Sequence, residues 1–209
     1  MTNELLLVGA GGHARSCIEV IESTNIYRIA GLIGQPNETG NSELGYKVIG
    51  QDDDIAQLVE LYSHALVSVG QIKSANLRVK LFNLIQQCGY VSPTIVASSA
   101  RVSKHVVIGA GSIVMHGAIV NAGATIGVNC IINSRSVIEH DVQIGDHSHV
   151  SVGAILNGGA TVSNETFIGS GALIKEGLNI GARCVIGMGV VVRRDVESES
   201  QVAGVGINE

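Results

Sequence analysis

Aliphatic residues recur at every sixth position through the second half of the chain, and this period most constrains the fold. Seventeen consecutive hexads, from Val96 to Val192, carry Val, Ile or Leu at the same place. Small side chains such as Ala118, Ser136 and Ala154 dominate two residues earlier. A period of six fits neither an α-helix nor alternating hairpin strands. It predicts a parallel β-helix of very short strands whose aliphatic residues point inward.

Three hexads close one triangular coil of 18 residues, so the repeats over 96–195 predict about five and a half coils. Glycine recurs directly after the aliphatic position and again two residues later, and we interpret these glycines as corners that need a positive φ. Thin coils leave little room for large rings, which agrees with an aromatic content of only 3% and no Trp.

A small α/β domain over residues 1–90 is predicted ahead of the repeats. Apolar strands at 4–8, 28–33 and 65–69 alternate with helical patterns at 13–22, 52–62 and 75–88, as in a Rossmann-like parallel sheet covered by helices. The polar segment 36–43 is predicted to be a mobile loop, residues 90–99 a linker, and residues 196–209 a C-terminal tail.

A glycine-rich loop follows the first strand and opens the first helix. Gly9, Gly11, Gly12 and His13 place backbone N–H groups at a helix start, where a phosphate binds well. The second strand ends Leu32-Ile33-Gly34 without the acidic residue that would hold the ribose of a redox dinucleotide. The loop therefore favours a nucleotide diphosphate-sugar, with a purely structural tight turn as the alternative.

Charge and hydropathy exclude several classes of partner. The net charge is −5 with no basic run, which argues against nucleic acid, and no apolar run approaches the length of a membrane span. We expect a cytoplasmic protein. Cys130 and Cys184 fall on the small inward position of the repeat and Cys17 lies in a predicted helix, without metal-type spacing, so reduced thiols are expected.

The chain resembles the bacterial sugar acetyltransferases among the left-handed β-helix (hexapeptide-repeat) acyltransferases. That family includes sialic acid O-acetyltransferases and N-acetyltransferases of UDP-4-amino-sugars. The resemblance rests on the Gly-Gly-His loop, the unbroken hexads, and the stretch Ile131-Ile132-Asn133-Ser134-Arg135-Ser136-Val137-Ile138-Glu139-His140 followed by Asp141. It implies a left-handed coil, acetyl-CoA as co-substrate and a sugar or nucleotide-sugar acceptor.

Two positions depart from the family pattern. The family often has an Asp pair where this chain has Gly34-Gln35, which bears on the nucleotide. The usual Gly-x-Pro near the C-terminus is Gly204-Val205-Gly206, which bears on the last contacts to coenzyme A.

Residues 18 apart should stack at the strand spacing of about 4.8 Å, which places His140 beneath Gly158, with Ala122 below and Glu176 above. Such a corner offers the two groups that acyl transfer needs, a base and an N–H donor for the developing oxyanion. The resemblance implies that His140 is the general base, that Asp141 assists it, and that the amide of Gly158 contacts the thioester. The alternative is an exposed corner histidine without a catalytic role.

Further contacts are expected around this corner. Gly153, Gly158 and Glu176 are candidate coenzyme-binding residues, and Glu139 and His149 are candidate substrate-binding residues beside the glycine loop residues Gly9, Gly11, Gly12 and His13. For His149, an interface histidine is an equally good interpretation. No covalent intermediate is expected, since no activated Cys or Ser is predicted beside His140.

The residue before each inward aliphatic faces outward, and two outer faces are apolar. One carries Ile119, Val137, Ile155, Leu173 and Val191, the other Ile113, Ile131, His149, Phe167 and Val185, while the third is mostly polar. Two different apolar faces that meet heterologously close a ring, most simply a homotrimer.

Two other functions stay open at this stage. A carbonic-anhydrase-like enzyme would bind zinc through histidines such as His105, His116 or His147 across an interface, although His140 has no histidine at a ligand spacing. A non-catalytic β-helix scaffold is the second. For the acetyltransferase, Asp141 and His149 favour an amine acceptor, whereas the segments 133–136 and 156–158 favour a sialic-type hydroxyl.

Overall fold

A computed structural model describes residues 3–203, which form two compact units. The first unit contains residues up to 70 together with 76–98, and the second contains residues 71–75 and those from 99 onward. The compact unit that contains the hexads therefore also includes residues 71–75, which precede them in the sequence. Among the described residues, no helix is both long enough and apolar enough to cross a bilayer.

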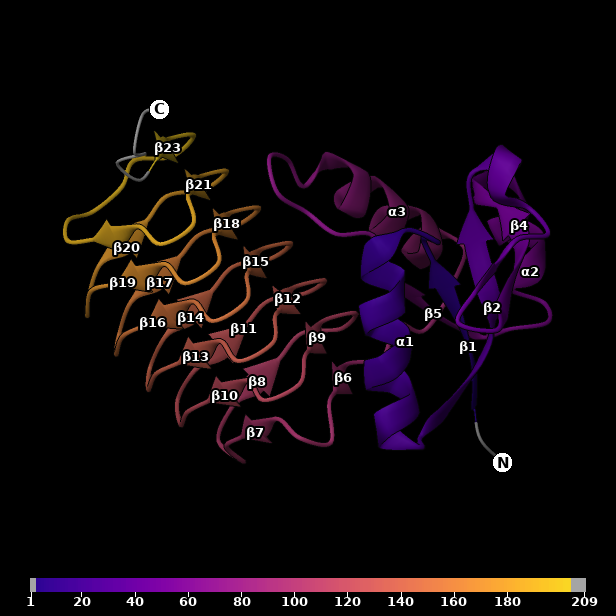
Figure 1. The fold of residues 1–209 in the computed structure, drawn as a ribbon, viewed down its shortest axis with the longest axis horizontal. Helices are drawn as coiled ribbons and strands as arrows, with labels where there is room; N and C mark the ends of the chain where they lie inside the picture. The colour runs from indigo at the N-terminus through magenta and orange to yellow at the C-terminus, as the bar shows by residue number, and fades with distance from the viewer. Residues whose placement is uncertain (1–2, 204–209) are drawn as a thin grey trace. The chain divides into compact units, whose positions relative to one another are not determined.

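Strands and helices alternate in the first unit, as predicted (Figure 1). The main elements are β1 (Asn3–Val8), α1 (Gly12–Thr24), β2 (Tyr27–Gly34), β3 (Ser42–Glu43), β4 (Tyr46–Gln51), β5 (His64–Val67), α3 (Asn76–Gln87) and β6 (Ile95–Val96). The sheet has the order β3-β4-β2-β1-β5. All its pairs are parallel apart from the short edge pair of β3 with β4. Its core is aliphatic, with Leu5, Leu7, Ile18 and Leu66 fully buried.

Two predictions about this unit are wrong. The segment 36–43 is regular structure rather than a mobile loop, with η1 (Pro36–Glu38) followed by β3 (Ser42–Glu43). The carboxylate of Glu38 accepts a hydrogen bond from the Gln35 amide at 2.7 Å, which caps this turn. The predicted helix over 52–62 is shorter, because it consists of η2 (Asp52–Asp54) and α2 (Ile55–Leu58).

The second unit is a left-handed β-helix. Sixteen two-residue strands, β7 to β22, each end on a predicted aliphatic residue. The first sheet contains β7 (Arg101–Val102), β10 (Ile119–Val120), β13 (Val137–Ile138), β16 (Ile155–Leu156), β19 (Leu173–Ile174) and β22 (Val191–Val192). The second contains β8 (Val107–Ile108), β11 (Thr125–Ile126), β14 (Gln143–Ile144), β17 (Thr161–Val162) and β20 (Asn179–Ile180). The third contains β9 (Ile113–Val114), β12 (Ile131–Ile132), β15 (His149–Val150), β18 (Phe167–Ile168), β21 (Val185–Ile186) and β23 (Gln201–Val202).

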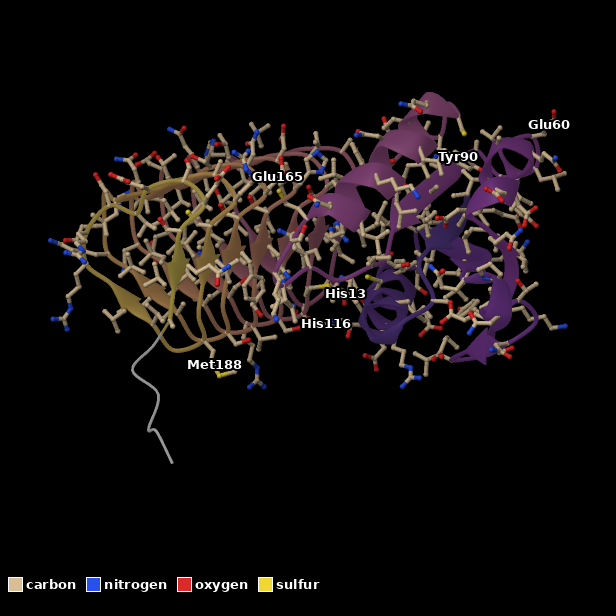
Figure 2. The ribbon with its side chains drawn as sticks, turned by 90° about the horizontal axis from the view of Figure 1, so that it is seen from above. His13, Glu60, Tyr90, His116, Glu165 and Met188 are labelled. Atoms are coloured by element: carbon tan, nitrogen blue, oxygen red, sulfur yellow. The ribbon has the colours of Figure 1, made fainter. Side chains whose placement is uncertain are left out.

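The register repeats every 18 residues, because Val120 pairs with Ile138 and Ile138 pairs with Leu156. Every corner that follows a strand from β8 to β21 contains a residue with positive φ, three positions after the inward aliphatic. Some of these residues are glycines, and others are Asn129, Arg135, Asp141, His147, Glu165 and Arg183. Figure 2 shows Glu165 and Met188 on opposite edges of the coils.

The glycines directly after the aliphatic position have a different role from the one predicted. They do not have a positive φ, but they let successive coils approach closely. A β-carbon added to Gly109 would come 2.5 Å from the carbonyl carbon of Gly127 one coil away. Of the two sets of glycines, only those three positions after the aliphatic residue have a positive φ. A Cβ at these positions would add strain.

A column of small polar residues lies inside one corner. The backbone N–H of Cys130 donates to Ser112 Oγ at 2.8 Å, and that of Cys184 donates to Thr166 Oγ1 at 3.1 Å. Cys130 and Cys184 are buried at the predicted inward positions. These side chains satisfy backbone groups that the corner would otherwise bury without a partner.

The β-helix continues beyond the boundary predicted at residue 195. Val196 bridges to Ile180, and β23 pairs with β21 at an offset of 16 residues instead of 18. The last coil is therefore two residues shorter, and its turn is fixed by Asp195, whose carboxylate accepts a hydrogen bond from the Asn179 amide at 2.8 Å. The segment Gly204-Val205-Gly206 lies outside the described residues.

Candidate functional site

One corner of the β-helix carries side chains capable of acid–base chemistry. The turn between β13 and β14 contains Glu139, His140 and Asp141, and the next coil places Gly158 in the same column. The Gly159 amide donates to the His140 carbonyl at 2.9 Å, and the Gly177 amide donates to the Gly158 carbonyl at 3.0 Å. The structure thus brings His140, Gly158 and Glu176 together at successive layers, as the 18-residue period predicts.

The imidazole of His140 lies directly against Gly158. A β-carbon built on Gly158 would come 2.6 Å from Nε2 and 2.7 Å from Cε1 of His140. Any residue other than glycine would therefore displace the ring. The Gly158 amide donates no backbone hydrogen bond within residues 3–203. This corner consequently presents an imidazole nitrogen and an uncommitted N–H donor side by side.

Asp141 orients the ring from the opposite side. Its Oδ2 lies 2.9 Å from His140 Nδ1, and because a carboxylate only accepts hydrogen bonds, Nδ1 carries the proton. The Nε2 lone pair is then free to accept a proton. Asp141 occupies a left-handed corner with φ of 60°. Gly123 lies one coil below, where a β-carbon would meet Asp141 Oδ1.

This pair is on the surface of the single chain. The side chains of His140 and Asp141 are 67% and 70% exposed, so the contact between them contributes little to folding stability. Asp141 holds the exposed imidazole in one tautomer, and glycines lie against both side chains. A catalytic role explains this arrangement better than a contribution to packing does. The arrangement can remove a proton at Nε2 and stabilise the imidazolium that forms.

The other predicted residues of the β-helix are distributed over several corners. Glu139 directly precedes His140, and Glu176 lies in the same column, with its carboxylate 3.9 Å from Lys175 Nζ. Gly153, with φ of 65°, belongs to the different corner between β15 and β16. Within one chain, Gly153 is therefore not brought to His140.

His149 faces outward from the coils, as predicted, but the chain itself covers it. Only 6% of the residue is exposed. Its Nδ1 lies 2.7 Å from the Gln71 carbonyl oxygen, and its Nε2 lies 3.0 Å from the Asn133 amide nitrogen. Phe167 packs edge-on against the ring at 5.2 Å between centroids. Both nitrogens are committed to structural contacts, so this position does not support substrate binding by His149.

The same burial corrects the prediction of two free apolar faces. Ile113 and Ile131 are fully buried and Phe167 is 9% exposed. The other apolar sheet remains accessible, with Ile155 36% and Val191 50% exposed. One apolar sheet of the β-helix, β7-β10-β13-β16-β19-β22, is thus available for association.

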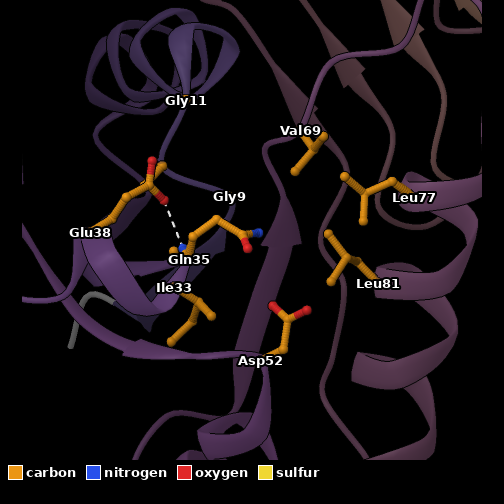
Figure 3. Close-up of a pocket in the computed structure, with 11 residues that line it drawn as sticks. Gly9, Gly11, Ile33, Gln35, Glu38, Asp52, Val69, Leu77 and Leu81 are labelled. Atoms are coloured by element: carbon orange, nitrogen blue, oxygen red, sulfur yellow. Dashed lines mark hydrogen bonds between the residues drawn. The ribbon is translucent and has the colours of Figure 1, made fainter.

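A second candidate site is a pocket of about 200 Å³ in the first unit. Gly9 and Gly11 of the glycine loop line it, together with Gln35, Asp52 and Val69 (Figure 3). Leu77 and Leu81 of α3 close its apolar side. Of the predicted loop residues, Gly12 and His13 are not among those that line this pocket.

The sequence did not point to Asp52 as a pocket residue, whereas it did single out Gln35 through the Gly34-Gln35 departure. Asp52 lies on η2 and is half-buried, and its carboxylate makes no hydrogen bond or ion pair within residues 3–203. Gly34 and Gln35 both line the pocket, and they stand where the resemblance led us to expect an acidic pair. Sequence patterns alone do not show which residues line this pocket, because its lining comes together only when β2 and β4 pair.

A buried guanidinium supports the wall of this pocket. Arg78 of α3 is 1% exposed, and its Nη1 donates to the carbonyls of Val67 and Val69 at the end of β5. Val69 lies against Gly9, where a β-carbon would come 2.6 Å from Val69 Cγ2. Burial raises the pKa of the nearby Cys17 thiol to about 12, although the Arg78 charge opposes this shift. A positive charge behind a glycine loop suits an anionic ligand.

Among the described residues, no three His, Cys, Asp or Glu side chains lie close enough together to hold a metal ion. The predicted corner histidines His105, His116 and His147 do not converge within one chain. Ser99 Oγ lies 2.8 Å from His116 Nδ1, and Asn129 Nδ2 lies 3.0 Å from His147 Nδ1.

Each of the two units matches a known protein family model. Residues 4–85 match the family model described as the PglD N-terminal domain. Residues 159–194 match the hexapeptide repeat of succinyl-transferase. No curated protein matches the chain in sequence.

Several solved structures are similar over nearly the whole chain. Perosamine N-acetyltransferase from Caulobacter crescentus, solved as a histidine variant with CoA and GDP-perosamine, is 31% identical with a TM-score of 0.91, covering 98% of this chain and 95% of that one. The acetyltransferase domain of PglB from Neisseria gonorrhoeae, solved with acetyl coenzyme A, is 28% identical with a TM-score of 0.88 and covers 98% and 97%. WeeI from Acinetobacter baumannii, 23% identical with a TM-score of 0.85 over 97% of each chain, shares the fold.

Proposed function

The chain belongs to the bacterial sugar acetyltransferases of the left-handed β-helix type, and from this we propose that it transfers acetyl from acetyl-CoA to the amino group of a nucleotide-activated amino sugar. The observation that carries the proposal is the contact of His140 Nε2 with Gly158, next to an uncommitted backbone N–H. The amine is favoured because the 31% identical structure is an N-acetyltransferase bound to GDP-perosamine.

In a direct transfer, His140 acts as the general base and the Gly158 amide stabilises the oxyanion. Nε2 of His140 takes a proton from the sugar amine as its nitrogen attacks the thioester carbonyl. The new C–N bond leaves negative charge on the carbonyl oxygen, which accepts a hydrogen bond from the Gly158 amide. Collapse of this intermediate breaks the C–S bond, and the departing thiolate takes the proton from the imidazolium. Asp141 stabilises that imidazolium while it exists.

The pocket of the first unit is the proposed nucleotide site. Backbone N–H groups at the start of α1, beside Gly9 and Gly11, bind the diphosphate, and the buried Arg78 adds positive charge behind them. The Asp52 carboxylate accepts hydrogen bonds from N–H donors of the base or O–H donors of the ribose. Gln35 offers the N–H donors and the oxygen acceptor of an amide where the family often has a carboxylate.

The proposal includes assembly and location. The accessible apolar sheet with Ile119, Val137, Ile155, Leu173 and Val191 supports self-association. A homotrimer, in which this sheet meets a different face of the next chain, stays the proposed state. We propose the cytoplasm as its location, where acetyl-CoA and nucleotide sugars are both at hand.

The direct test is thiol release from acetyl-CoA with a panel of acceptors. UDP- and GDP-linked 4-amino-sugars should release thiol, whereas sialic-type sugars test the hydroxyl alternative. Failure of every sugar to release thiol would refute the enzyme proposal. An Asp52→Asn variant should raise KM for the nucleotide sugar with little effect on KM for acetyl-CoA. Glu60→Gln, which removes an exposed carboxylate of the same unit (Figure 2), serves as the matched control.

A further inference from the structure

We propose that Gln71 and His149 are positioning residues that hold one side of the nucleotide pocket in place. The inference rests on the proposed function, because it takes the pocket of the first unit as the site of the nucleotide sugar. It is carried by three observations: the chain that joins the pocket to residue 71, the hydrogen bonds that fix Gln71 on the β-helix, and the tautomer of His149.

Residues 71–75 join two residues that line the pocket. The chain leaves the first unit after Gly70 and returns to it at Asn76, while residues 71–75 belong to the second unit. Val69 and Leu77 line one side of the pocket (Figure 3), and each lies two residues from an end of this segment. Two residues of extended chain span at most about 7 Å. A shift of residues 71–75 is therefore transmitted along the main chain to the pocket.

Gln71 fixes this segment on the β-helix at two points. Its backbone carbonyl oxygen lies 2.7 Å from His149 Nδ1, and its side-chain Nε2 donates to the Glu165 carbonyl at 3.3 Å. Gln71 is only 3% exposed, whereas Ile72 and Lys73, which follow it, are exposed. These two hydrogen bonds therefore attach the start of the segment to the third sheet and the corner before it.

Asn133 fixes the proton of His149 on the nitrogen that faces Gln71. The Ser134 amide donates to Asn133 Oδ1 at 2.8 Å, which leaves Asn133 Nδ2 facing His149 Nε2 at 3.0 Å. An amide nitrogen only donates, so Nε2 accepts and the proton lies on Nδ1. The Phe167 ring packs edge-on against the imidazole. His149 is thereby oriented as a donor to the Gln71 carbonyl.

Packing alone does not explain a glutamine at position 71. Its Oε1 is buried and has no hydrogen-bond partner within residues 3–203, and such an acceptor destabilises a folded chain. Methionine has a similar length and no such atom, so Gln71→Met removes both the hydrogen bond to Glu165 and the unsatisfied oxygen. The two effects on folding stability oppose each other. This variant should therefore weaken the attachment of the segment and keep the fold.

The test measures nucleotide binding apart from the reaction. Binding of UDP and GDP, without acetyl-CoA, is measured by calorimetry on the wild type and on His149→Ala, Gln71→Met and His149→Asn. His147→Ala is the matched control, since the His147 ring lies against Asn129 within the repeats. His149→Ala and Gln71→Met should bind the nucleotide about 3- to 10-fold more weakly, as expected for one lost hydrogen bond. His149→Asn keeps a side-chain N–H donor near the place of Nδ1 and should recover most of the affinity.

Steady-state kinetics with the sugar that releases thiol provides a second readout. KM for the nucleotide sugar should rise by the same factor in His149→Ala and Gln71→Met. KM for acetyl-CoA and kcat should change little, because neither residue touches the reacting groups in this proposal. Circular dichroism and melting curves establish that each variant folds.

Each outcome decides. Weaker nucleotide binding in His149→Ala and Gln71→Met, with recovery in His149→Asn and no loss in His147→Ala, supports the proposal. Wild-type nucleotide affinity in both variants overturns it and leaves the acetyltransferase function intact, and a fall in kcat at that affinity indicates a direct role for His149 in the reaction. An equal rise in both KM values overturns it in favour of a general structural role.

Failure of the proposed function is seen separately. If the wild type releases no thiol with any sugar, the acetyltransferase proposal fails, and the binding of UDP and GDP still decides the role of Gln71 and His149. If the wild type binds neither nucleotide, this inference is overturned whatever the activity.

Discussion

The imidazole of His140 rests on Gly158 of the next coil, so that a β-carbon at Gly158 would lie 2.6 Å from Nε2. The base and the amide of the proposed site are therefore held by the spacing of the coils. Because that spacing is set by main-chain hydrogen bonds through the whole stack, this geometry does not depend on any mobile loop.

His140→Ala should lower kcat by roughly 10²- to 10⁴-fold, the usual range for general acid–base catalysis. Acetyl-CoA affinity should change little, because the proposed contact to the thioester comes from a backbone amide and not from the imidazole. Asp141→Asn should cost less, since Asp141 contacts only the Nδ1 side of the ring. Steady-state kinetics with the identified sugar measures both variants. Wild-type turnover in His140→Ala would show that the base is elsewhere.

Gly158→Ala should abolish most activity without loss of folding stability. The added methyl would push the exposed His140 ring away, and a misplacement of about 1 Å can cost 10²-fold in rate. Gly159→Ala is the matched control, because nothing lies within 4 Å of its β-carbon but its φ is 68°. It should lose about 1 kcal/mol of stability through left-handed strain and keep its kcat. The opposite pattern, an active Gly158→Ala, would contradict the site.

Ile155→Arg should convert the proposed trimer to monomers. Ile155 lies in the accessible apolar sheet, and burying an unpaired guanidinium between chains costs several kcal/mol. Sedimentation velocity measures the change. Val107→Arg is the control, since Val107 is 67% exposed on the mostly polar sheet. A monomeric wild type would remove the basis for this prediction.

Tyr90 should make folding stability fall at alkaline pH. Burial, with a smaller contribution from Cys88, raises the pKa of Tyr90 from 10.0 to about 12, so the folded protein favours the neutral phenol. The stabilisation is complete below pH 10 and is lost as the pH rises towards 12, on the order of 2 kcal/mol. Urea unfolding of wild type and Tyr90→Phe at pH 8 and pH 11 measures this loss. The variant should lack that decrease, although it loses the hydrogen bond to the Ile55 carbonyl. An equal decrease in both proteins would contradict the assignment.

The β-helix was predictable in detail because each coil repeats one local rule. A strict period of six fixes the strand positions, the inward residues and the neighbours of His140. The shorter last coil escaped prediction because the aliphatic period ends at Val192, and the pairing of Val196 with Ile180 depends on Asp195 binding the Asn179 amide.

Long-range contacts account for most of the other differences. His149 occupies an outward position of the hexad, yet Gln71 covers it from 78 residues away in the sequence. The pocket around Asp52 likewise depends on the pairing of β2 with β4, and β4 alternates too briefly to be recognised as a strand. Periodicity describes neighbours along one column, and it contains no information about a segment that packs from outside the repeat.

The constant height of the coils means that the length of the β-helix changes only in fixed steps. Every 18 residues inserted into the stack would lengthen it by one layer, and every 18 deleted would shorten it by one layer, with the internal register preserved. Any surface that follows the column of His140 and Gly158 therefore changes in length by whole coils and not by continuous adjustment.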